Sequence, residues 1–121
     1  MTDKSLALSS PEQAIVRARG QAVILDSDLA ALYGGTIKRL NEQVRRNRKR
    51  FPEDFVFQLS VNEWGSLRSH FATLKRGQHR KYRPYAFTEH GAIMAANVLN
   101  SEQAETMSVA VVRAFVKLRR M

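Results

Sequence analysis

The chain contains no cysteine, no long apolar run and no recognisable secretory signal, and these absences exclude several classes of protein. Without cysteine there is no disulfide framework, no thiolate metal site and no cysteine nucleophile, which fits a reducing compartment. No apolar run approaches the ~20 residues that a membrane-spanning helix needs. Residues 1–10 lack the basic region and apolar stretch of a secretory signal. We therefore expect a cytoplasmic protein with no membrane association.

Acidic residues are few in comparison with basic ones. Lys and Arg number 20 against 11 Asp and Glu, which gives a formal net charge of +9 and an isoelectric point near 10.7. Such an excess on a small chain attracts polyanions, namely nucleic acid, acidic membrane or acidic protein. The alternative is a basic protein whose charge serves only its solubility.

The length of 121 residues suits one domain with a hydrophobic core, and we expect a loose leader over 1–12 and a single domain over 13–121. Turn and capping signals predict the elements of that domain. Strands are expected at residues 21–25, 55–59 and 85–87. Helices are expected to begin at Ser10-Pro11 (carrying residues 14–16), at Asp26 as a cap, at Thr36, at the capping box Ser60 to Glu63, at Thr88, and after residue 100. The predicted class is α+β, with a helix-turn-helix-like core, two or three short strands and a closing amphipathic helix.

Residues 28–47 have the layout of a helix-turn-helix, in which a short helix ends at Gly34-Gly35 and a second helix begins at the capping residue Thr36. Ile37, Leu40 and Val44 lie on one side of this second helix at 100° per residue, and would face the core. The opposite side carries the candidates for base recognition in the major groove, because Arg can pair with guanine and Gln with adenine. These are Arg39, Gln43 and Arg46, flanked by Lys38, Glu42 and Arg45. Thr36, at the start of the helix, is placed in the same interface.

The end of this helix is too densely charged for base recognition alone. A run of cations favours contact with phosphates, and it comprises Arg45, Arg46, Arg48, Lys49 and Arg50. A second basic region is predicted to be an exposed arm along the DNA backbone or in the minor groove, and it comprises Lys75, Arg76, Arg80, Lys81 and Arg83. For each region the alternative is a solvated charged surface without a ligand.

Catalysis is not expected. The three histidines are His70, His79 and His90, and no two of them have the i, i+4 spacing of a helical zinc site. The Glu89-His90 pair is better explained as the start of a helix that Thr88 caps. The chain has no phosphate-binding glycine loop, and its acidic residues do not cluster as a nuclease metal site requires. We therefore predict a binding module with no cofactor, no metal and no small-molecule substrate.

Several short sequence motifs resemble those of one family and occur in the same order along the chain. They are Arg19-Gly20, 23–25, Asp28-Leu29-Ala30, Leu32-Tyr33-Gly34, Leu40-Asn41, Val44, Arg46-Asn47, Arg50-Phe51-Pro52, Asp54-Phe55, 57–59, Tyr82, 84–89, Gly91 and 113–116. Together they are similar to the phage ORF-six N-terminal (ORF6N-type) DNA-binding domain, which is allied to the KilA-N and Bro-N domains. The resemblance spans residues 15–119. Gly35 departs from the family, where a β-branched residue is usual.

The resemblance implies a small α+β DNA-binding domain of phages and prophages, often joined to a second domain, so that this chain is either shortened or a stand-alone member. We expect duplex DNA as its partner and transcription regulation as its role, in a prokaryotic or phage-infected cell. The alternative is a protein-interaction module, such as an antirepressor that binds another regulator. A homodimer is also expected, through the apolar face of the last helix (Met107, Val111, Phe115 and Leu118).

Overall fold

A computed structural model describes residues 10–70 and 82–121 of the chain. The elements follow in the order α2 (Pro11–Ala14), β1 (Ile15–Ala18), β2 (Gln21–Leu25), α3 (Asp26–Leu32), α4 (Ile37–Arg46), a 3-10 turn η1 (Arg48–Arg50), β3 (Val56–Gln58), α5 (Val61–His70), β4 (Tyr85–Phe87), α6 (Glu89–Leu99) and α7 (Glu102–Arg119). This mixture of helices with an antiparallel sheet confirms the predicted α+β class.

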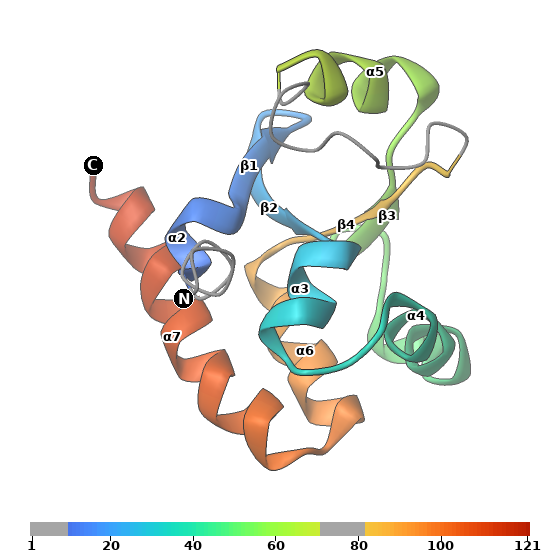
Figure 1. The fold of residues 1–121 in the computed structure, drawn as a ribbon, viewed down its shortest axis with the longest axis vertical. Helices are drawn as coiled ribbons and strands as arrows, with labels where there is room; N and C mark the ends of the chain where they lie inside the picture. The colour runs from blue at the N-terminus through green and yellow to red at the C-terminus, as the bar shows by residue number, and fades with distance from the viewer. Residues whose placement is uncertain (1–9, 71–81) are drawn as a thin grey trace, which may run out of the picture.

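The sheet has four strands in the order β1-β2-β4-β3, and all neighbours are antiparallel (Figure 1). The central strand β4 joins segments that are far apart in the sequence, since Phe87 lies opposite both Ile24 of β2 and Val56 of β3. The three strands predicted from the sequence are present, with β3 one residue shorter at each end.

Both faces of the sheet are covered, because successive side chains of a strand point to opposite sides. Ile24 and Phe87 belong to a large core with α3, α4, α6 and α7. Their neighbours Leu25 and Ala86 belong to a smaller core with Trp64 of α5. Figure 1 shows this division, with α5 on one side of the strands and the other long helices on the opposite side.

Strand β1 is the element that the sequence analysis missed. Residues 15 and 16 were expected in a helix, but α2 ends at Ala14 and Ile15–Ala18 pair with β2 over their whole length. Arg19 and Gly20 connect the two strands with positive φ angles of 54° and 75°, which is the backbone of a two-residue hairpin turn. Helix α2 begins at Pro11, and residues 1–9 of the predicted leader lie outside the described part.

Several predicted helix starts are confirmed by the capping bonds. The hydroxyls of Thr36, Thr88 and Ser101 accept the backbone N–H groups three residues later, and Ser60 and Glu63 form a complete capping box. Asp26 was wrongly expected to cap α3. The structure makes it the first residue of that helix and buries it completely.

Helix α7 packs its predicted apolar face inside the chain. Val111 and Phe115 are buried in the large core, Met107 packs against it, and only Leu118 is exposed. The protein's own core therefore occupies the face through which a homodimer was predicted. None of the helices in residues 10–70 and 82–121 is long and apolar enough to span a membrane.

Candidate nucleic-acid interface

Helix α4 lies at the edge of the molecule and is attached to it along a narrow apolar stripe. Leu40 is buried, and Ile37 and Val44 pack against the same core, as their spacing predicted. The turn before α4 is tight, because Gly34 has a φ of 77° and the Gly35 N–H bonds to the Ala30 carbonyl 2.8 Å away. This attachment leaves the opposite side of α4 free to carry charge.

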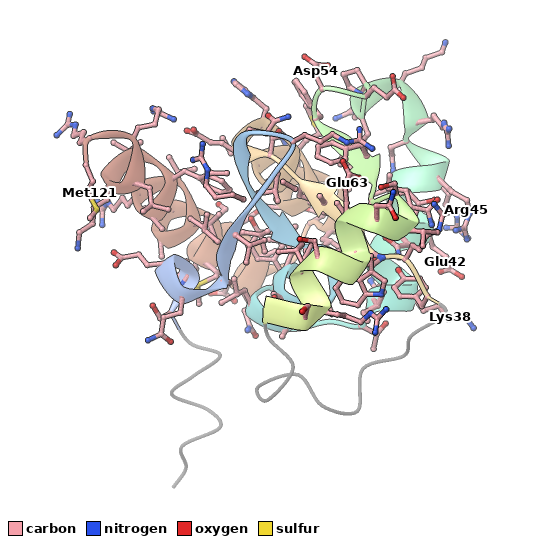
Figure 2. All side chains as sticks on the ribbon, turned by 90° about the horizontal axis from the view of Figure 1, so that it is seen from above. Lys38, Glu42, Arg45, Asp54, Glu63 and Met121 are labelled. Carbon is pink, nitrogen blue, oxygen red and sulfur yellow. The ribbon has the colours of Figure 1, made fainter. Side chains whose placement is uncertain are left out.

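The exposed side of α4 and η1 carries most of the predicted DNA-binding residues. Seven cations are exposed there, namely Lys38, Arg39, Arg45, Arg46, Arg48, Lys49 and Arg50. In Figure 2, Lys38 and Arg45 project from one edge of the molecule together with Glu42. Within the described ranges, none of these seven side chains forms a salt bridge. The cations therefore have charge available for an external anion.

The helix is shorter than predicted, and its end has a specific cause. α4 stops at Arg46, where the Asn47 side-chain amide donates to the Gln43 carbonyl at 2.8 Å. Arg48 and its two successors then form η1, so the basic tail is a separate turn and does not continue the helix. Gln43 is half-buried and its side-chain oxygen lies 3.5 Å from the Asn47 amide nitrogen. Thr36, which was also placed in the interface, caps the helix.

A buried carboxylate connects α4 to the chain that follows the second basic region. Asp26 Oδ2 accepts hydrogen bonds from Asn41 Nδ2 of α4 at 3.3 Å, from the Tyr85 N–H at 3.2 Å, and from the Tyr82 hydroxyl. Asn41 Nδ2 also donates to the Tyr82 oxygen at 3.0 Å. Asp26 Oδ1 has no hydrogen-bond partner among the described residues. We call Asp26, Asn41, Tyr82 and Tyr85 the Asp26 cluster.

Burial dominates the acid–base chemistry of this cluster. It raises the pKa of Asp26 above its ordinary value, and the hydrogen bonds from Tyr82, Tyr85 and Asn41 oppose that rise only in part. Burial and the adjacent Asp26 carboxyl raise the pKa of the Tyr82 hydroxyl above its usual range. The cluster could not be predicted from the sequence, because Asp26 lies at a helix start, where an aspartate normally caps, and its partners are up to 59 residues away.

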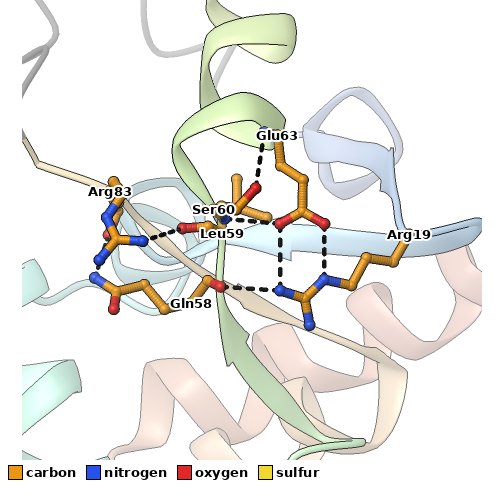
Figure 3. A network of polar contacts seen from close by, with 6 residues as sticks. All are labelled: Arg19, Gln58, Leu59, Ser60, Glu63 and Arg83. Carbon is orange, nitrogen blue, oxygen red and sulfur yellow. Dashed lines mark hydrogen bonds and ion pairs between the residues drawn. The ribbon is translucent and has the colours of Figure 1, made fainter.

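The second basic region is described only at its end. Lys75, Arg76, Arg80 and Lys81, which were predicted to bind DNA, lie outside the described residues. Arg83 is described and half-buried, and its Nη1 donates to the Leu59 carbonyl at 3.2 Å, while Gln58 Nε2 donates to the Arg83 carbonyl at 3.0 Å (Figure 3). The structure thus gives Arg83 a role in fastening this chain to β3.

The same network includes an ion pair next to β3. Arg19 Nε lies 2.7 Å from Glu63 Oε2, Arg19 Nη2 donates to the Gln58 carbonyl at 3.3 Å, and the guanidinium covers the Phe57 ring at 4.1 Å (Figure 3). The hydrogen bonds from Arg19 and the Ser60 N–H lower the pKa of Glu63 to about 2. This pair holds the β1–β2 hairpin against α5, so Arg19 serves the fold.

The Glu89-His90 pair has structural partners. Glu89 forms an ion pair with Arg119 of α7, and the His90 ring stacks on Phe55 with centroids 5.3 Å apart. Both line an open cleft together with Arg17 and Asp54. No group of three or more His, Cys, Asp or Glu that could hold a metal ion occurs among residues 10–70 and 82–121.

A family model described as "ORF6N domain" matches residues 13–98. The match begins in α2 and ends in α6, so it contains the sheet, the Asp26 cluster, α4 and η1. It stops before α7, although the sequence resemblance was expected to continue to residue 119. No curated protein and no solved structure matches the chain.

Proposed function

Because the chain belongs to the ORF6N domain family, which is phage-associated, we propose that it is a non-catalytic DNA-binding protein that acts in phage or prophage regulation. The observation that carries the proposal is the row of seven exposed cations on α4 and η1. Contacts between such cations and phosphates release counterions, which favours binding to duplex DNA whatever its sequence.

The shape of α4 supports an entry into the major groove. A helix of 10 residues is about 15 Å long, and the major groove is about 12 Å wide and admits a helix. Because α4 is attached through Leu40 and its apolar neighbours, its outward side can approach the base edges without unfolding. We assign base contacts to Arg39 and Arg46, with Gln43 reaching a base after it releases its weak contact with Asn47.

The rest of the basic row is assigned to phosphates. η1 is a separate turn after α4, so Arg48, Lys49 and Arg50 need not follow the groove floor that α4 occupies. Their dense charge suits the DNA backbone, where position matters less than in base recognition. The Asp26 cluster would hold α4 at a fixed place relative to the chain that enters at Tyr82.

Binding of the protein to a random-sequence duplex, measured by fluorescence anisotropy over a range of salt concentrations, tests the proposal. With about five phosphates contacted, log K should fall with log salt at a slope of about −4.5. Arg46→Ala should weaken binding, whereas Arg17→Ala should not, because Arg17 is an exposed arginine of β1 whose side chain donates to the Gly20 carbonyl. The control removes the same charge at a distance from α4.

Three outcomes separate the assignments. A loss for Arg46→Ala that is restricted to selected DNA sequences assigns the residue to a base, at about 1–3 kcal/mol. An equal loss on every sequence assigns it to a phosphate. No measurable duplex binding at low salt would refute the proposal and favour the alternative, an antirepressor that binds an acidic surface of another regulator through the same cations.

A further inference from the structure

The outer side of α7 carries an apolar stripe that is only partly covered in the described part of the chain, since Val109 is exposed and Val112 and Val116 are half-buried. Val109 is 51% exposed, and Val112 and Val116 follow on the same side of the helix at spacings of three and four residues. The last two valines line a shallow groove that continues to Met121, whose side chain is 90% exposed, and the basic residues Arg113, Lys117 and Arg120 line the same groove. This outer stripe lies on the opposite side of α7 from Val111 and Phe115.

Charged residues lie at both ends of the stripe. Glu105 lies one turn before Val109, and Arg120 lies one turn after Val116. Both side chains are exposed, and within the described ranges neither forms an ion pair. The outward-facing stripe is therefore acidic at its start, apolar over its middle and basic at its end.

The order of these residues is symmetric about a point in the second half of the helix. Glu105 and Arg120 are equidistant from the point between residues 112 and 113, and so are Val109 and Val116. An antiparallel copy of the same helix would therefore place Val109 against Val116, and Val112 beside Arg113. It would also place each acidic end against a basic end. A parallel copy would place like charges together.

We propose that the outer stripe of α7 binds a second copy of this chain, with the two helices antiparallel about a twofold axis near Val112. Such an isologous contact uses the same patch on both subunits, which the symmetric order of the stripe satisfies. Two Glu105–Arg120 pairs form across the axis, and they set the register of the valines. This interface replaces the one expected through the buried face of α7.

The contact is small, because each copy contributes one helix face with three valines and Met121. Interfaces below about 1,200 Å² belong to weak or transient complexes, so dimerisation depends on protein concentration. The interface is remote from the basic row, since Figure 2 shows Met121 and Arg45 at opposite edges of the molecule. A dimer therefore leaves α4 of both copies exposed, and the inference does not depend on DNA binding.

Sedimentation equilibrium of the full chain without DNA, from micromolar to millimolar protein, tests the proposal. The wild type should show a monomer–dimer equilibrium. Glu105→Arg alone and Arg120→Glu alone should each raise the dissociation constant about tenfold, because each puts two like-charge contacts into the dimer. The double variant Glu105→Arg/Arg120→Glu should restore it, because opposite charges again face each other.

Glu53→Arg serves as the control, since it makes the same charge change in an exposed turn far from α7 in the sequence. It should leave dimerisation unchanged. Circular dichroism of every variant checks that the fold is retained. We expect it to be retained, because Glu105, Arg120 and Glu53 are all exposed. A wild type that stays monomeric at millimolar concentration overturns the proposal. So do single variants that dimerise like the wild type, or a double variant that fails to recover.

Discussion

Removing the carboxyl group of Asp26 should destabilise the protein more than any change to the exposed basic row. In Asp26→Ala the Tyr85 N–H loses its acceptor, and Tyr82 and Asn41 keep only the bond to each other. A buried donor without an acceptor costs about 1–3 kcal/mol. Tyr82 is 38% exposed and can bond to water, so we count one full penalty and part of a second, about 2–4 kcal/mol in total.

Asp26→Asn separates the hydrogen bonds from the charge. The Asn side-chain oxygen can take the place of Oδ2 and accept the same three donors, so the loss should be smaller than in Asp26→Ala. Because the folded protein raises the pKa of Asp26 above its ordinary 3.8, the unfolded chain ionises first as the pH rises. The wild type therefore loses stability relative to Asp26→Asn from about pH 4 upward, until the raised pKa is passed.

Urea denaturation at several pH values measures both effects, with free energies of unfolding taken from the linear extrapolation. Tyr82→Phe is the matched control, because it removes one donor to Asp26 and leaves the carboxyl in place. If the free energy of unfolding of Asp26→Ala lay within about 0.5 kcal/mol of the wild-type value, the change would be no larger than that of an ordinary surface substitution. The Asp26 cluster would then contribute nothing measurable to stability. A gap between wild type and Asp26→Asn that widens in favour of the wild type at higher pH would contradict the assigned pKa direction.

Three further predictions concern single contacts. Thr36→Ala removes the hydroxyl that caps the Arg39 N–H, 3.1 Å away, and should lower the free energy of unfolding by about 1 kcal/mol. An unchanged midpoint of thermal unfolding would contradict the capping role. Gly91→Ala would place a Cβ 2.1 Å from the Phe55 carbonyl oxygen, so we expect about 3 kcal/mol or more of destabilisation, and urea unfolding like that of the wild type would refute this packing. Glu63→Gln should have a lower free energy of unfolding than the wild type above about pH 4.5. The two values should converge as the pH falls to about 2, because the wild type loses the stabilisation from ionised Glu63 over that range. A difference that does not change with pH would contradict the lowered pKa of Glu63.

Much of the fold could be predicted because its signals are local. A capping hydroxyl bonds to an amide three residues away, so Thr36 and Thr88 predicted the starts of their helices. The capping box that begins at Ser60 predicted the start of α5 in the same way. The apolar spacing of Leu40 and its neighbours gave the buried side of α4, and its exposed side followed as the complement. The site prediction for α4 and η1 needed no more than this helical geometry.

Other features could not be predicted because they depended on distant residues. Ile15 and Val16 have no local preference strong enough to decide between helix and strand, and pairing with β2 decided it. Arg83 is one cation among several in the sequence, and only the position of the Leu59 carbonyl shows what its guanidinium binds. The apolar face of α7 fits either a core or a partner, and the packing of Phe115 inside the chain settled the choice.

The strongly basic charge, the α+β class and the row of cations that follows Thr36 can all be read from the amino-acid sequence. These properties depend on composition and on contacts within a few residues. The packed fold was needed to show that Asp26 joins α4 to the chain at Tyr82, and which side of α7 stays exposed. The physical reason is that burial and long-range hydrogen bonds arise when segments far apart in the chain are packed together, and no local pattern records them.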